Sequence, residues 1–487
     1  MLSQRFSLSG AWIPVTFGLL AVLLGGATGV AVVWLGKPLW AVAGVLGMFV
    51  ALTSMLNAEV GLLGLLFITF IRLSDVLVKF YGAPSIAKPF IGLMLVGIAL
   101  RWFFYRRPPR GWLRAALLVA LWGVMVFTSL IYATNFDRSY NALDDFIKDG
   151  LIAVIVVVLV QRKGMFRWSF WALIGAGLFM GALSVYQYLT GSYSNTYGGF
   201  AQASLMNIVG QSSDYRIGGP YNSPNVFAQI MVALIPLALE RLFAERNWLL
   251  KLLAGVSVAM IALAVIFTFS RSGFISLALA VGIFLLMRRT QFGTYVLLAA
   301  LALALISFAP AQYTDRLSTL TDLFSSPTAV QTEYSFRGRA SEAMVGWMMF
   351  LDHPLLGVGA KNYAVYYQAY SRQLGIDPRA ENRSAASLYI EIAAEEGLMG
   401  IVVFSILIFS VYSGLNSARR TFERLKKPDM VSMTVAVAIS MTVYLSSALF
   451  INSAYPRPFW ILVGLSLAFP VFAQTLSESH FKRADHD

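Results

Sequence analysis

The stretch SGFISLALAVGIFLLM, residues 272–287, contains no charged residue and, as a helix, approaches the thickness of a bilayer core. Comparable blocks occupy residues 295–310 and 397–412, and others recur along the chain. Inside lipid, backbone polar groups must find partners within the protein, so each block is a helix or a strand of a closed barrel. The blocks lack the alternation of barrel strands and are too long for them. The sequence therefore predicts membrane-spanning helices.

The composition excludes an ordinary soluble protein. Hydrophobic residues make up 58% of the 487 residues and charged residues 13%, against about 45–50% and about 25% in soluble domains. We expect an all-α polytopic membrane protein, a single membrane domain over residues 1–487 with about 12–14 transmembrane helices. The predicted spans lie near residues 13–35, 38–56, 59–80, 86–104, 112–133, 146–161, 168–189, 224–241, 249–268, 272–287, 291–310, 396–415, 431–451 and 457–475.

Lysine and arginine gather in alternate connections, and such loops face the cytoplasm. This pattern predicts a multi-pass protein of the bacterial plasma membrane, the inner membrane, with both termini cytoplasmic. It also explains the net charge of +13 by membrane anchoring to lipids, so no nucleic-acid partner is expected. The basic clusters are Arg101/Arg106/Arg107/Arg110/Arg114, Arg162/Lys163/Arg167, Arg241/Arg246/Lys251, Arg288/Arg289 and Arg419/Arg420/Arg424/Lys426/Lys427.

The opposite, external side receives three longer connections, residues 134–145, 190–223 and 311–395. The last is by far the largest, and long loops of this kind are usually functional. Helical spacing of apolar residues predicts short helices within it, around Gly338–Leu351 and Ala360–Gln373.

Several familiar centres are missing from the sequence. There is no phosphate-binding Gly-rich motif, no dinucleotide fingerprint and no cysteine. The three histidines are His353, His480 and His486, too few for a histidine metal site. Asp144 and Asp145 are adjacent, so their side chains diverge on a helix, and we interpret them as a surface pair. Neither a cofactor nor a metal is expected.

Arginines at the predicted outer boundary are the main chemical signal. Arg271 lies in FSRSG (269–273), Arg337 and Arg339 lie in SFRGR (335–339), and Arg216 precedes GGPYNSPN (218–225), which ends at Asn225. Charge beside hydrocarbon is costly, so such residues usually have a partner or a task. Guanidinium groups bind phosphate oxygens in a bidentate way without a metal. The alternative is that each pairs with a lipid headgroup or a nearby carboxylate.

Other polar features favour structural roles. His353 lies in DHPLLGVG (352–359), which is typical of a helix stop and tight turn. Arg72 and Asp75 are spaced to pair on one helix face. Four tyrosines share one predicted helix side, where interfacial anchoring is favoured over sugar stacking. They are Tyr363, Tyr366, Tyr367 and Tyr370.

Four segments together resemble the O-antigen ligase and O-antigen polymerase family of membrane glycosyltransferases. They are residues 216–225, 269–273, 339–359 with Asn362, and 387–400. The resemblance implies transfer of an oligo- or polysaccharide from undecaprenyl diphosphate to a hydroxyl of a glycan, lipid or protein acceptor, without metal. Lipopolysaccharide or another cell-envelope polysaccharide would be the product. It implies that Arg271 and Arg339, or else Arg337, hold the diphosphate, with Arg216, Asn225 and Tyr389 as further substrate-binding candidates.

One position departs from the family pattern. Family members carry a histidine shortly before a run like SLYIEIAAEEG (387–397), and here that position is Ala386. An alanine neither binds an acceptor hydroxyl nor acts as a base, and losing a positioned base lowers a rate by about 10²–10⁴-fold. Three explanations stay open: an inactivating His-to-Ala change, a branch that uses another base, or a shifted alignment. The candidates for another base are Glu381, Glu391 and Glu395.

Two other classes of function compete with a glycosyltransferase. A transporter or flippase of lipid-linked sugars would show internal repeats and broken helices near the midplane, and no matched pair of interrupted spans stands out. A non-catalytic scaffold of polysaccharide assembly would be compatible with Ala386. A cavity at the outer membrane face between Arg271 and the 311–395 loop favours the transferase. Ligase and polymerase use the same donor, so the sequence does not separate them.

Overall fold

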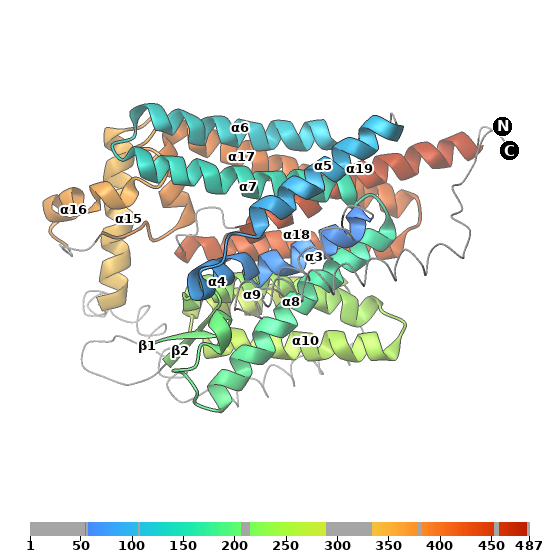
Figure 1. The fold of residues 1–487 in the computed structure, drawn as a ribbon, viewed down its shortest axis with the longest axis horizontal. Coiled ribbons are helices and arrows are strands. Elements are labelled where there is room, and N and C mark those ends of the chain that lie inside the picture. The colour runs from blue at the N-terminus through green and yellow to red at the C-terminus, as the bar shows by residue number, and fades with distance from the viewer. Residues whose placement is uncertain are drawn as a thin grey trace, which may run out of the picture.

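The computed structural model describes residue 54 and residues 57–105, 108–205, 215–288, 334–376, 382–451 and 457–484. This part of the chain folds mainly into long helices that run side by side (Figure 1). The spans expected near residues 13–35, 38–56 and 291–310 lie outside the described residues, apart from Ser54.

Within the described residues, eight helices are long and apolar enough to cross a membrane, and the bent pair α3–α4 would make a ninth. The predicted all-α membrane fold is thus confirmed. The eight are α5 (Ala87–Tyr105), α6 (Trp112–Tyr132), α8 (Lys163–Leu189), α9 (Pro224–Ala244), α10 (Trp248–Phe267), α17 (Leu388–Arg424), α18 (Pro428–Ser447) and α19 (Arg457–Ala484). Helices α3 (Ala58–Phe70) and α4 (Leu73–Tyr81) meet at 54°, and Arg72 between them has a φ of 55°.

Two helices begin earlier than the hydropathy predicts. Helix α7 (Phe136–Leu159) starts where the Asn135 side chain accepts a hydrogen bond from the Arg138 amide, so a cap and not apolar content sets its first turn. Helix α17 starts at Leu388, capped by Ser387, and is broken at Gly397 (φ 64°, ψ −155°). The predicted span near 396–415 begins at this break. Helix α11 (Arg271–Arg288) is apolar but short.

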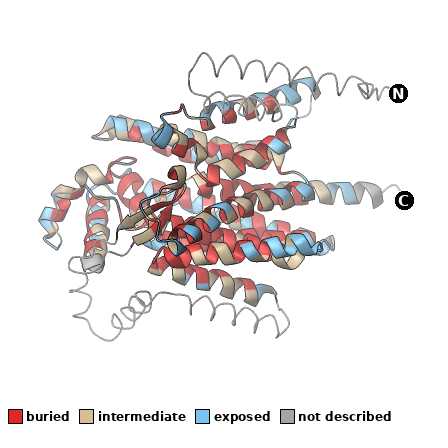
Figure 2. Cartoon of the chain, turned by 60° about the horizontal axis from the view of Figure 1, so that its bottom comes forward, coloured by how far each residue is buried: buried red, intermediate tan, exposed pale blue. Residues whose placement is uncertain are grey.

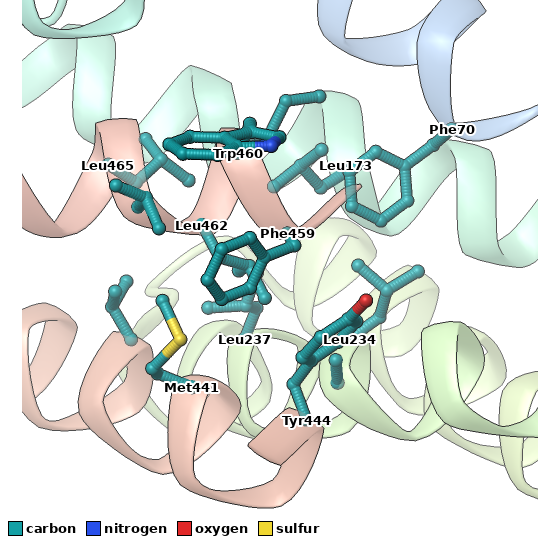
Figure 3. Close-up of a cluster of buried hydrophobic side chains, with 14 of the residues drawn as sticks. Phe70, Leu173, Leu234, Leu237, Met441, Tyr444, Phe459, Trp460, Leu462 and Leu465 are labelled. Carbon is teal, nitrogen blue, oxygen red and sulfur yellow. The ribbon is translucent and has the colours of Figure 1, made fainter. Parts of the chain in front are cut away.

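The core forms around α9, which is buried along most of its length and contacts α8, α10, α11 and α18. Figure 3 shows Phe459 of α19 packed near Leu237 of α9 and Met441 and Tyr444 of α18. Buried residues concentrate where helices face one another, and exposed residues follow their outer sides (Figure 2). The exposed side of α6 is itself apolar, as expected of a face that contacts lipid. Its residues include Leu113, Leu117, Val124, Phe127 and Ile131.

Ion pairs join several connections at one end of the bundle. Arg167 at the start of α8 binds Glu245, which follows α9, at 2.7 Å, and Arg241 binds the same carboxylate at 3.1 Å. Lys163 pairs with Asp429 at the start of α18. The α7–α8, α9–α10 and α17–α18 connections therefore meet at this basic end.

The opposite end carries the remaining elements (Figure 1). Helices α15 (Tyr334–Asp352) and α16 (Tyr363–Leu374) lie there, close to the two short helices expected within the long loop. The antiparallel strands β1 (Gln202–Leu205) and β2 (Tyr215–Gly219), which the sequence did not predict, lie at the same end. Short 3₁₀ turns occupy η1 (Tyr197–Gly199) and η2 (Ala448–Phe450). We call α15, α16 and the turn between them the cap.

The prediction that the α16 tyrosines anchor at the membrane interface is wrong for three of them. Tyr363, Tyr367 and Tyr370 are buried in a small core that the cap forms with Val345 and Met349 of α15. Tyr370 donates a hydrogen bond to Asp352 at 2.7 Å. Burial and this bond raise the pKa of the Tyr370 phenol to about 12, so it remains a donor.

Candidate functional site

The cap joins the membrane bundle through the break in α17. A helix break leaves backbone groups without helical partners, and the turn at residues 354–359 supplies them. The amides of Val358 and Gly359 donate to the carbonyls of Ala394 and Glu395 at 2.9 and 2.8 Å. In return, the Leu398 amide donates to the Pro354 carbonyl at 2.8 Å. The DHPLLGVG segment is thus a tight turn, as predicted, and its backbone completes a membrane helix.

Two buried polar side chains fix the chain after this turn. Glu395 accepts hydrogen bonds from the amides of Lys361 at 2.7 Å and Tyr363 at 3.0 Å, so it holds the start of α16. Asn362 accepts from the Asn135 amide at 2.9 Å and donates to the Ser139 hydroxyl at 2.8 Å. The cap is therefore tied to α7 as well as to α17.

A cavity of about 370 Å³ lies where α15 meets the bundle. It brings together Asn225 from the start of α9, Arg339 from α15 and Ala386 from the segment before α17, three of the residues singled out in the sequence. Phe450 and Ile451, which follow α18, contribute to its wall. We call it the arginine cavity.

The arginine cavity also contains charged residues that the sequence analysis missed. Arg383 donates a hydrogen bond from Nη1 to Oε1 of Glu342 at 2.7 Å, and both residues line the cavity with Arg339. The charged lining among the described residues is thus two arginines and one carboxylate. The proximity of Arg383 to Ala386 in the sequence was the available signal, but its pairing with α15 depends on the tertiary fold.

Arg216 and Arg271 lie near this cavity, where β2 and the start of α11 contact the start of α9. Arg216 in β2 donates to the Thr268 carbonyl at 2.8 Å and to Oδ1 of Asn225 at 3.0 Å, and so fixes the asparagine that lines the cavity. Arg271 is the first residue of α11. The start of α11 contacts the start of α9 closely, because a Cβ added at Gly273 would lie 2.7 Å from Ala228. Arg271 is not among the described residues that line the cavity.

The remaining candidates have other surroundings. Tyr389 donates from its hydroxyl to the Leu445 carbonyl at 3.0 Å, which joins α17 to α18. Glu391 is buried in the first turn of α17. Arg337 belongs to α15, but its side chain, like the whole of Glu381, lies outside what the structure describes. Arg72 pairs with Asp75 at 2.8 Å, as its spacing predicted.

Residues 256–405 match the family model described as O-antigen ligase. The match assigns this segment to the O-antigen ligase family. It runs from α10 to α17 and includes Arg271, Arg339 and Ala386, while Arg216 and Asn225 precede it. A search of curated proteins finds no match. The predicted family resemblance is therefore confirmed, and it supports a glycosyltransferase of the O-antigen ligase or polymerase type in a multi-pass membrane protein.

Proposed function

We propose that the chain transfers a glycan from undecaprenyl diphosphate to an acceptor hydroxyl at the outer face of the bacterial inner membrane. The O-antigen ligase match supports the reaction class. The observation that carries the proposal is the arginine cavity, where Arg339, Asn225 and Ala386 meet although they lie far apart in the sequence.

In this reaction the acceptor oxygen forms a bond to the anomeric carbon of the donor glycan, while the bond from that carbon to the diphosphate breaks. The diphosphate leaves with the bonding electrons, and the acceptor hydroxyl gives up its proton. Arg339 would stabilise the growing negative charge, which is the kind of electrostatic effect that often dominates catalysis. Arg271, at the start of α11, would bind the same diphosphate. Arg216 would act indirectly, by holding Asn225 in place.

The proton acceptor is the open element of the site. Ala386 lines the cavity at the position where the family resemblance places a histidine. Of the described carboxylates, Glu342 lines this cavity, and its partner is Arg383. Glu395 does not line this cavity and accepts hydrogen bonds from two backbone amides, which favours a structural role over that of a base. We propose that transfer by this chain is slow unless position 386 bears an imidazole.

The proposal also includes the orientation of the chain. The cap end, with the 311–395 loop, would face outward, and the ion-paired basic end with both termini would face the cytoplasm. One membrane domain over residues 1–487 would then contain the whole site.

The test is a reconstituted transfer assay with purified protein, a defined undecaprenyl-diphosphate glycan and candidate acceptors, alongside the variant Ala386→His. Transfer that depends on Arg339 supports the proposal, and the product length separates one transfer from many. If both proteins bind donor normally but neither releases undecaprenyl diphosphate from any donor, the proposed reaction is wrong. That result would favour a transport or scaffold role.

A further inference from the structure

A second cavity, of about 410 Å³, lies on the other side of Val226, which lines both cavities. It is bordered by the α3–α4 break at Arg72 and by the part of α17 that precedes the break at Gly397. Two interrupted helices thus meet at one hollow at the cap end of the bundle. Helices are interrupted in membrane proteins where they line a binding site or a water-filled space.

The charge of this cavity is opposite to that of the arginine cavity. Among its described lining residues, acidic side chains outnumber basic ones, so we call it the acidic cavity. Arg457 at the start of α19 binds Asp149 at 3.0 Å and Asp75 at 3.3 Å, and Lys361 binds Asp145 at 2.9 Å. At the α17 wall, Glu395 accepts its two backbone hydrogen bonds, and Glu396 also lines the cavity. Of these two cavities, arginines outnumber carboxylates only in the described lining of the arginine cavity, so a diphosphate fits the acidic cavity less well.

Glu396 is the residue that points to a ligand. Its side chain is 2% exposed and lines the acidic cavity. Its Oε2 atom makes no hydrogen bond with any residue that the structure describes. Leaving a buried carboxyl oxygen without a partner is costly, so the site is one hydrogen-bond donor short. A hydroxyl or amine of a bound molecule would supply it.

The rest of the lining suits a sugar. Trp122 and Tyr221 contribute aromatic rings beside the polar groups, and concave sites with aromatic walls and a few converging polar groups bind small polar molecules. The rim is accessible, because Lys361 and Asp145 expose 44% and 50% of their side chains. Within the described chain no group of three or more acidic or histidine side chains could hold a metal ion, so a cation fits less well.

We propose that the acidic cavity binds the sugar that carries the attacking hydroxyl, a neutral or amino sugar, while the arginine cavity binds the donor diphosphate. This inference rests on the proposed function and assigns its second substrate. Val226 lines both cavities, so a sugar bound in the acidic cavity would lie next to a donor bound in the arginine cavity. Glu396 would bind and orient the acceptor.

The test measures binding and not transfer. Saturation-transfer NMR on the full chain in nanodiscs would use diacetylchitobiose, glucosamine and glucuronic acid as probes. We expect saturation-transfer signals for diacetylchitobiose and glucosamine, and a weaker signal or none for glucuronic acid. Glu396→Gln should lower the affinity for the first two by at least about tenfold. The matched control is Glu478→Gln, because Glu478 is exposed on α19 and should not affect binding. Binding that is absent from the parent protein, or equal in Glu396→Gln and the parent, overturns the inference.

A second measurement does not depend on a variant. Dicyclohexylcarbodiimide labels carboxyl groups in apolar surroundings, and mass spectrometry locates the label. Diacetylchitobiose should protect Glu396 by several-fold, whereas inorganic pyrophosphate should not; the reverse pattern contradicts the inference. Sugar binding that needs Glu396, with no transfer by either the parent or Ala386→His, would contradict the proposed reaction and leave this site standing. Transfer together with sugar binding that does not depend on Glu396 would support the proposed reaction and contradict this assignment of the acceptor site.

Discussion

Gly357 lies directly against the backbone of Glu395: a Cβ atom added at Gly357 would come within 2.4 Å of the Glu395 carbonyl carbon and oxygen. Gly397 stands in the same relation to Leu355, at 2.6 Å. The two glycines, each with positive φ, let a loop and a broken membrane helix exchange hydrogen bonds. The position of the cap over both cavities depends on this contact.

Replacing Gly357 by alanine should therefore destabilise the protein more than backbone strain alone predicts. A positive φ costs a non-glycine residue roughly 1–2 kcal/mol, and here the methyl group also collides with backbone. The matched control is Gly375→Ala at the end of α16, which has a similar φ of 69° but no atom within 4 Å of the added Cβ. Thermal unfolding in detergent should show a clearly larger loss for Gly357→Ala. Equal losses would mean that the close contact is not important.

Removing the Arg339 guanidinium should slow glycan transfer by about 10²–10³-fold, the usual loss for a group that stabilises developing negative charge. Arg339→Lys should retain part of the rate, because the lysine ammonium keeps the positive charge but cannot make the bidentate hydrogen bonds of a guanidinium. Arg372→Ala is the control, because Arg372 is exposed on α16. The rate of undecaprenyl diphosphate release reports the effect. A rate unchanged in Arg339→Ala would remove this residue from the donor site.

Placing a histidine at position 386 should raise transfer by about 10²–10⁴-fold if the missing base limits the reaction. Ala386→Phe is the control for bulk, because it fills similar space without a proton acceptor. The gain should fall below the imidazole pKa, since the protonated ring no longer accepts a proton. Equal rates for the two variants would contradict the assignment of this position.

Truncating Asn362 to alanine should loosen the cap from α7. The change leaves the Asn135 amide and the Ser139 hydroxyl without this partner, and each lost buried hydrogen bond costs about 1–3 kcal/mol. The control is Asn141→Ala on the same helix α7, whose side chain is exposed. Limited proteolysis of the membrane-embedded protein should cut the Asn362→Ala cap faster. Identical cleavage rates in both variants would show that other contacts hold it.

The parts of the fold that hydropathy controls could be predicted from the sequence. Helices α6, α9 and α10 lie close to the predicted spans, because an apolar run between polar ends is sufficient to specify each. The start of α17 could not be predicted in this way. Its first turns carry Glu391, Glu395 and Glu396, and beyond the Ser387 cap they are held by residues 354–359 and the start of α16, which lie elsewhere in the sequence.

The candidate site also has parts that the sequence predicted and parts that only the tertiary structure shows. The spacing and residue types singled out Arg339, Asn225 and Ala386, and the fold brings these three to one cavity. The pairing of Arg383 with Glu342 was not visible, since it joins segments across the cap. The acidic cavity was missed for a similar reason. Its carboxylates come from different helices. Glu395 accepts two backbone hydrogen bonds, whereas Glu396 has an oxygen with no partner among the residues that the structure describes.

The backbone exchange at the α17 break constrains how the protein can move. The amides of Val358, Gly359, Leu398 and Met399 all donate across the break, so lifting the cap would deprive four amides of these partners. A hinged opening of the cap at the α17 break is therefore disfavoured. The lipid-linked donor would have to enter laterally from the membrane, between the bundle and a cap that does not move. Hydrogen–deuterium exchange would record this as slow exchange of those four amides in step with the interior of α17.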